Sequence, residues 1–142
     1  MENLAIDSGA VELTIDGDKD RIIRFYPTDV SFAEAYYALA DRFGKLRGEV
    51  AEKERTISES GMPNEEKIRE RIRLSKSVYG ELESGIDEVF GPGTYHTVFG
   101  KHNNIEMVAR FFRGISTYVR AARDREVKRY TNAAKESGVL EC

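Results

Sequence analysis

Two apolar stripes run through the middle of the chain with alternating spacings of three and four residues. The first stripe comprises Phe32, Tyr36, Leu39, Phe43, Leu46, Val50 and Ile57. The second stripe comprises Ile68, Ile72, Tyr79, Leu82, Ile86 and Val89. An apolar position about every 3.5 residues predicts amphipathic helices that pack their apolar faces together, as in a coiled coil.

The two stripes predict an antiparallel helical hairpin over residues 31–90, because the numbers of facing residues add to a nearly constant 121 or 122. In this register Leu39 faces Leu82, and Phe43 faces Tyr79. A seam of this kind packs helices together and encloses no pocket for chemistry. The pattern therefore favours an assembly or interaction protein over an enzyme.

Shorter elements are expected before the helical hairpin. Alternating apolar residues on both sides of Asp16-Gly17 predict a β-hairpin within residues 1–27, with residues 4–6 as a possible third strand. Ser31 and Glu34 have the spacing of a capping box, which predicts the start of the first long helix.

The segment after the helical hairpin is expected to be a loop over residues 91–100 followed by one more helix. Val-Phe-Gly occurs twice, at 89–91 and 98–100, and each phenylalanine is expected to anchor the chain in the core. The last helix is expected over 103–132 with Asn103 or Asn104 as its N-cap, and 133–142 as a flexible tail. The fold class predicted for residues 1–142 is one α+β domain that is mostly helical.

Composition limits the environment of the protein. Charged residues make up 33% of the 142 residues, and the mean hydropathy is -0.52. No apolar run approaches the roughly 20 residues that span a bilayer, and the N-terminus has no pattern of a signal peptide. Cys142 is the single cysteine and has no partner for a disulfide. We therefore expect a cytoplasmic protein with no membrane contact.

The charge is unevenly distributed. Residues 101–135 carry 9 lysines and arginines against 3 aspartates and glutamates, whereas residues 1–100 carry 13 against 20. The basic positions of the last helix are Arg110, Arg113, Arg120, Arg123, Arg125, Lys128 and Arg129. Such a helix is able to follow a phosphate backbone, but an acidic protein surface or solvent would neutralise it equally well. Nucleic-acid binding is the less favoured reading because no reader motif accompanies the charge.

The sequence predicts no catalytic, cofactor-binding or metal-binding residue. His96 and His102 lack the spacing of a helical metal pair and are expected to be surface or capping residues. The Gly91-Pro92-Gly93-Thr94 segment resembles a phosphate loop only superficially, since it has no lysine, and a structural turn is favoured. A small enzyme of unrecognised type is the third class that we considered.

Several short motifs in this order carry a resemblance to a known family. They are Phe25-Tyr26-Pro27-Thr28-Asp29, then Asp87 to Thr94, Val98-Phe99-Gly100, and Lys128-Arg129-Tyr130. This arrangement resembles short prophage proteins of Gram-positive bacteria that are encoded among tail genes. The resemblance implies a non-enzymatic tail-assembly chaperone without cofactors, whose partner is the helical tape-measure protein or another tail protein.

The candidate binding surface combines the helical hairpin with the basic helix. Apolar contact would supply affinity and positive charge would speed association. The residues predicted to bind the partner are Phe43, Leu46, Val50, Ile68, Ile72, Arg120, Arg123 and Arg125. A homo-oligomer is also expected, because a β-ribbon and an amphipathic hairpin leave surfaces that a lone chain of this size does not cover.

Overall fold

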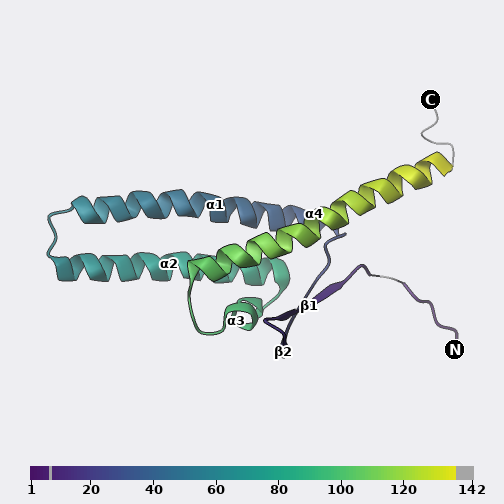
Figure 1. Ribbon diagram of the computed structural model, residues 1–142, viewed down its shortest axis with the longest axis horizontal. Coiled ribbons are helices and arrows are strands. Elements are labelled where there is room, and N and C mark those ends of the chain that lie inside the picture. Colours follow the sequence, from purple (N-terminus) through teal and green to yellow (C-terminus); the bar gives the residue numbers. More distant parts are fainter. Residues whose placement is uncertain (7, 137–142) are drawn as a thin grey trace. The chain divides into compact units, whose positions relative to one another are not determined.

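The computed structural model describes residues 1–6 and 8–136, and within them it has two strands followed by four helices (Figure 1). The fold class predicted from the sequence is confirmed: α+β, mostly helical, with an N-terminal antiparallel β-hairpin. The elements are β1 Val11–Ile15, β2 Asp18–Phe25, α1 Val30–Glu59, α2 Asn64–Phe90, α3 Thr94–Phe99 and α4 Ile105–Glu136.

The chain divides into two compact units. The first contains the described residues of Met1–Glu34 and Asn104–Cys142, and the second is Ala35–Asn103. Unit 1 thus holds the β-hairpin, the first turn of α1 and helix α4. Unit 2 holds the remainder of α1 together with α2 and α3. That the two units make one domain stays a prediction.

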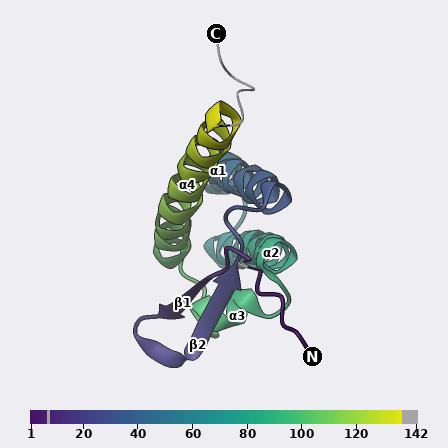
Figure 2. The ribbon, with the colours of Figure 1, turned by 90° about the vertical axis from the view of Figure 1, so that its right-hand side faces the viewer.

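The β-hairpin in unit 1, shown in Figure 2, has a two-residue turn at Asp16 and Gly17. Asp16 and Gly17 both have positive φ, 52° and 74°, which is the backbone that a tight turn between right-twisted strands requires. The strands pair Val11 with Phe25, and a bulge follows Thr14. Residues 4–6 form no strand, so the expected third strand is wrong.

An aromatic cluster holds unit 1 together. Phe25 at the end of β2 is almost fully buried, with its ring 5.7 Å from that of Phe32 and 6.2 Å from that of Tyr118. Within the same unit, Arg123 of α4 donates to the carbonyl oxygen of Thr28 over 2.9 Å. Phe32 therefore packs on the β-hairpin of its own unit.

Helix α1 begins at a different cap from the one predicted. The Asp29 carboxylate accepts a hydrogen bond of 2.8 Å from the Ser31 amide, which makes Asp29 the N-cap and Val30 the first helical residue. Asp29 is placed there by its own amide, which donates to the Tyr26 carbonyl across the Pro27 turn. The predicted capping box at Ser31 and Glu34 thus lies two residues too late.

Unit 2 is built on the antiparallel pair α1 and α2, which run side by side over most of their length (Figure 1). Its buried side chains recur at helical spacing on both helices, as the amphipathic pattern predicts. The buried apolar side chains of this unit are Tyr36, Phe43, Leu46, Leu82, Ile86, Tyr95, Val98 and Phe99. Next to the loop between the helices, the ammonium of Lys67 on α2 donates to the Ser58 carbonyl on α1.

The pairs found between α1 and α2 are shifted from the predicted register by about one to three residues. Leu39 lies against Gly85, and Arg42 is paired with Glu81. The reason is that α2 turns Leu74 and Val78 toward α1, while Ile68 and Ile72 of the predicted seam remain about half exposed. Each residue along a helix is rotated by 100° from the one before it. Leu74 and Val78 therefore lie on a different face of α2 from Ile68 and Ile72.

The segment 91–100, expected to be a loop, contains the short helix α3. The two predicted reversals are present, since Gly91 and Gly100 both have positive φ. Phe99 is buried, as predicted, with its ring 4.8 Å from that of Tyr95. Phe90 is only partly buried and makes an edge contact with Tyr36, so it is a weaker anchor than expected.

Helix α4 begins at a predicted cap and is longer than expected. Asn104 is the N-cap, because its side-chain oxygen accepts from the Glu106 amide over 2.9 Å. The helix continues to Glu136. Residues 133–136, which were predicted to belong to a flexible tail, are therefore helical. The rest of that predicted tail, 137–142 with Cys142, lies outside the described residues.

Candidate functional site

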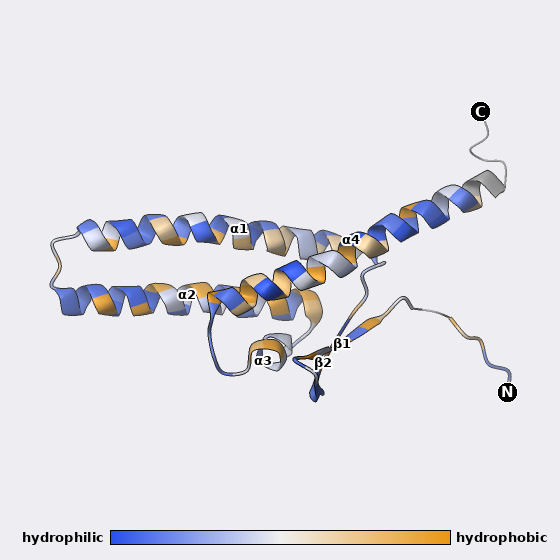
Figure 3. Cartoon of the chain, viewed as in Figure 1, coloured by the Kyte–Doolittle hydropathy of each residue, from blue (hydrophilic) through white to orange (hydrophobic). Residues whose placement is uncertain are grey.

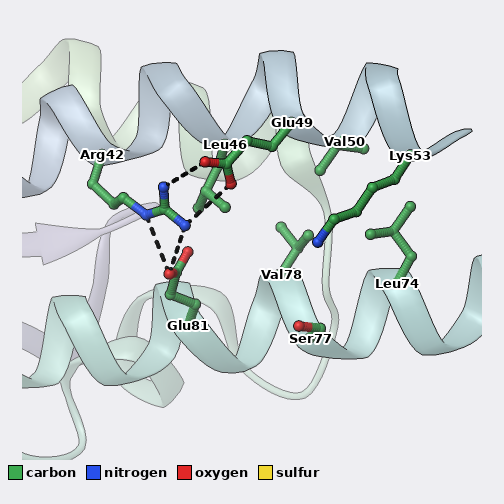
Figure 4. Close-up of a pocket in the computed structure, with 9 residues that line it drawn as sticks. All are labelled: Arg42, Leu46, Glu49, Val50, Lys53, Leu74, Ser77, Val78 and Glu81. Carbon is green, nitrogen blue, oxygen red and sulfur yellow. Dashed lines mark hydrogen bonds and ion pairs between the residues drawn. The ribbon is translucent and has the colours of Figure 1, made fainter.

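A polar cluster lies between α1 and α2 over an apolar floor (Figure 4). The floor of this recess, whose volume is about 100 Å³, is formed by Leu46, Val50, Leu74 and Val78. At its edge Arg42 bridges the two helices. The guanidinium donates to both carboxylate oxygens of Glu49 on its own helix and to Glu81 on α2, over 2.9 to 3.2 Å.

The electrostatics of this cluster favour the charged forms of its members. Hydrogen bonds from Arg42 lower the pKa of Glu49, with Lys53 and Lys45 adding a smaller effect. The same carboxylates raise the pKa of the Arg42 guanidinium. All three groups remain well exposed to solvent, so the ion pairs are screened and each contributes little to stability. The cluster fixes which residues of α1 and α2 face each other. All three nitrogen atoms of the Arg42 guanidinium already donate to Glu49 or Glu81.

The second surface is an open groove on the outer side of α2. Ile68 and Ile72 are 55% and 52% exposed, which is unusual for two isoleucines one turn apart. The groove has a volume of about 490 Å³ and is lined by Ile68, Arg71, Ile72, Ser75, Lys76, Tyr79 and Asn103. Asn103 is fixed at one end by the Tyr95 hydroxyl, which donates to its side-chain oxygen over 2.9 Å.

Burial of Tyr95 affects its acidity. Desolvation raises the pKa of the Tyr95 phenol, and the nearby Tyr79 and Glu83 act in the same direction. The phenol therefore stays protonated and keeps its donor for Asn103. The hydrogen bond from the Tyr95 hydroxyl to the Asn103 side chain, two uncharged groups, thus connects α3 to the end of the groove.

The predicted partner-binding residues of the hairpin separate into two groups. Phe43 and Leu46 are 8% and 7% exposed and pack inside the hairpin, so they cannot present a surface to a partner. Val50 is half buried in the floor of the polar recess. Only Ile68 and Ile72 face outward as the prediction required. Phe43 and Leu46 are buried because they lie on the apolar stripe of α1 that packs against α2. Helix α2 has a second apolar stripe, with Ile68 and Ile72, that faces outward.

The predicted arginines of α4 also differ from one another. Arg120 and Arg125 are exposed. Arg123 is partly buried and donates to the Thr28 carbonyl within unit 1. Its guanidinium thus stabilises the fold of this unit. Arg120 and Arg125 remain candidates for contact with an acidic partner.

Several residues of the two surfaces were not singled out by sequence reasoning. Leu74 and Val78 were not predicted to face α1 because the apolar spacing in the sequence also fits their neighbours Ile72 and Tyr79. Arg42, Ser75 and Lys76 carry no motif, and only the placement of α1 on α2 gives them their surroundings. Leu74 and Val78 are apolar and four residues apart, and this spacing in the sequence could have indicated a second apolar face on α2.

The loop after α2 is a structural turn, as predicted. The Asp87 carboxylate accepts from the Gly93 amide over 3.2 Å and from the Tyr95 amide over 2.8 Å. These are amides that a bound phosphate would need, and the carboxylate already occupies them. Thr94 closes the turn by donating its hydroxyl to the Gly91 carbonyl.

Both histidines are exposed, as expected. His96 has Nε2 2.8 Å from Glu83 and Nδ1 3.3 Å from the Gly100 carbonyl, so it joins α3 to α2 and to the end of α3. Among the described residues no group of three or more histidine, cysteine, aspartate or glutamate side chains is placed to hold a metal ion. In the same part of the chain, no helix has the length and apolarity to cross a membrane.

Comparison with known proteins gives one match. A family model described as a family of unknown function (DUF6673) matches residues 23–137, which is most of the chain and includes every helix described above. No curated protein matches the chain. No solved structure matches it either.

Proposed function

This chain belongs to the family of unknown function DUF6673, and we propose that it is a non-enzymatic protein that binds an amphipathic helix of another protein. The resemblance to tail-assembly chaperones suggests the helical tape-measure protein, or another tail protein, as the partner. The binding surface is the outer groove of α2. Arg120 and Arg125 of α4 would add positive charge that speeds association with acidic stretches.

The observation that carries this proposal is the exposure of Ile68 and Ile72. They stand four residues apart, so both point from the same side of α2, and Tyr79 continues the line. Isolated exposed apolar residues are common, whereas an aligned stripe on a helix suits the apolar face of a second helix. Figure 3 shows hydrophobic segments recurring along α2 among hydrophilic ones.

Co-expression with a tail tape-measure protein from the same genome tests the proposal. We expect the wild-type chain to increase the soluble fraction of the tape-measure protein several-fold, and Ile68→Ala with Ile72→Ala to remove the increase. Both side chains are half exposed, so the double variant should remain folded, which circular dichroism checks. The matched control is Ile105→Ala with Val127→Ala, two exposed apolar residues of α4. The proposal would be refuted if the tape-measure protein were equally soluble with the wild-type chain, with the double variant and with no added chain.

Nucleic-acid binding through α4 is the second candidate. Arg110, Arg113 and Arg120 are exposed and spaced so that they share one side of the helix. The aromatic residues interleaved with them do not favour base stacking, since Phe111 and Phe112 are buried and Tyr118 contacts Phe25. Tyr130 is exposed and remains able to stack on a base, so phosphate contact would supply most of the binding, without sequence preference and with a steep fall as salt rises. Measurable DNA or RNA binding that Arg113→Glu with Arg120→Glu removes would favour this candidate.

A further inference from the structure

The lining of the α2 groove has the pattern of two consecutive sockets for the side chains of a facing helix. In packed helices, a side chain of one helix enters a hole formed by residues i, i+3, i+4 and i+7 of the other. One such set is Ile68, Arg71, Ile72 and Ser75, and the next is Ile72, Ser75, Lys76 and Tyr79. Six of the seven lining residues are accounted for by these two sockets.

The sockets are open because a small residue stands between them. Ser75 belongs to both sets, and its short side chain leaves depth between Ile72 and Tyr79. From Ile68 to Tyr79 the sockets extend over about 16 Å of helix. An occupant with three helical turns would match this length, presenting two apolar side chains three or four residues apart.

The charge of the lining restricts the occupant further. Each socket includes one cation, Arg71 or Lys76, and the lining contains no carboxylate. Arg71 is paired across the hairpin with Glu54 at 2.7 Å, whereas Lys76 makes no ion pair with another described residue. Two other carboxylates of α2 already have cationic partners, since Glu65 pairs with Arg69 and Glu70 with Arg73.

A second copy of the chain is a poor occupant of the groove. If two α2 helices packed this stripe against itself, both copies of Arg71 and Lys76 would lie in one shared groove without a carboxylate from either lining. Like charges placed opposite each other oppose such pairing. A helix with acidic residues beside its apolar ones would instead neutralise Lys76 and bury Ile68 and Ile72.

We infer that the groove binds one helix of a partner protein, with apolar residues every three to four positions and acidic residues flanking them. The inference rests on the proposed function and specifies the chemistry of the partner. Apolar side chains fill the two sockets, and a carboxylate of the partner reaches Lys76. The contact is thus specified by two sockets and one cation on a single helix of unit 2.

Two synthetic helical peptides of about four turns test this chemistry directly. They share one stripe of leucines at alternating spacings of three and four, and they differ only in flanking residues, glutamate in one and lysine in the other. By fluorescence anisotropy at low salt, we expect the glutamate peptide to bind the wild-type chain about five- to tenfold more tightly. Lys76→Glu should remove or reverse that preference. The matched control Lys45→Glu changes an exposed lysine of α1 outside the groove and should preserve it.

The possible outcomes separate this inference from the proposed function. Equal binding of both peptides, or a preference that Lys76→Glu does not alter, overturns the acidic partner. Binding that survives Ile68→Ala with Ile72→Ala places the peptide elsewhere and overturns the sockets. Failure of both peptides to bind also overturns the inference, while the co-expression experiment judges the proposed function independently. A wild-type dimer that this double variant abolishes would make a second copy the occupant.

Discussion

Gly85 of α2 lies directly against Leu39 of α1. A Cβ atom at position 85 would come within 2.6 Å of Leu39 Cδ1, closer than such atoms approach in proteins. At Gly80, five residues earlier on the same helix, a Cβ would meet nothing within 4 Å. Two glycines of one helix therefore have different reasons for their presence, and only Gly85 permits the close approach of α1.

Substituting both glycines by alanine measures this difference. Gly80→Ala should raise the free energy of unfolding by about 0.5–1 kcal/mol, because alanine favours the helix. Gly85→Ala should gain less or lose stability, since Leu39 must move to admit the methyl group. Urea denaturation of the two variants gives the comparison. In a Leu39→Ala background the two substitutions should have similar effects, and equal gains in the wild-type background would contradict the contact.

The helices themselves were predictable, because their apolar periodicity persists over many turns. What the pattern could not decide was which of two neighbouring stripes of α2 faces α1. Ile72 and Leu74 are both apolar and lie on different faces, and the interior residue is selected by partners distant in sequence, such as Arg42 with Glu81. The register and the composition of the outer groove follow from that selection.

The start of α1 shows the same limit on a smaller scale. Asp29 and Ser31 are both good N-cap residues, so the local sequence permits either. The choice is made by the bond from the Asp29 amide to the Tyr26 carbonyl, which turns the chain just before the helix. Interactions between residues far apart, such as Arg123 with Thr28, had no sequence signal at all.

The Arg42 cluster should make the stability of the hairpin depend on pH. Because the pKa of Glu49 is lowered in the folded chain, the stabilisation is present above the ordinary glutamate range and is lost as the pH falls through the lowered value. Thermal melting at neutral pH and at about pH 3 should show a smaller acid-induced decrease for Arg42→Gln than for wild type.

Arg47→Gln is the matched control for this experiment. Arg47 is an exposed arginine of the same helix, and no ion pair joins it to another described residue. Its substitution should leave the difference between the two melting temperatures unchanged. The cluster would be unimportant for the pH dependence if Arg42→Gln behaved like Arg47→Gln.

Asp87 should stabilise the turn between α2 and α3. Its carboxylate satisfies the amides of Gly93 and Tyr95 at the start of α3, as a helix cap does. Asp87→Ala should lower the free energy of unfolding by about 1–2 kcal/mol, whereas Glu88→Ala, at an exposed neighbouring position, should change it little. Amide hydrogen exchange at Gly93 and Tyr95 should increase in the first variant. Unchanged exchange there would contradict the capping role.

Self-association is expected through the β-hairpin rather than through the α2 groove. Within the described residues β1 pairs only with β2, and its other edge has no strand beside it. A two-stranded ribbon is marginal by itself, and an open edge invites a strand of another copy. Light scattering at micromolar concentrations should therefore give a multiple of the 16.1 kDa chain mass.

Variants of the two surfaces distinguish which one joins the copies. Thr14 is exposed on β1, so Thr14→Lys should lower the mass without unfolding the chain, because an edge lysine opposes strand pairing. Ile68→Ala with Ile72→Ala should leave the mass unchanged, since self-pairing of the groove would gather Arg71 and Lys76 of both copies. A monomer mass for the wild-type chain would contradict self-association altogether. A mass that falls only in the isoleucine variant would move the interface from the β-hairpin to the groove.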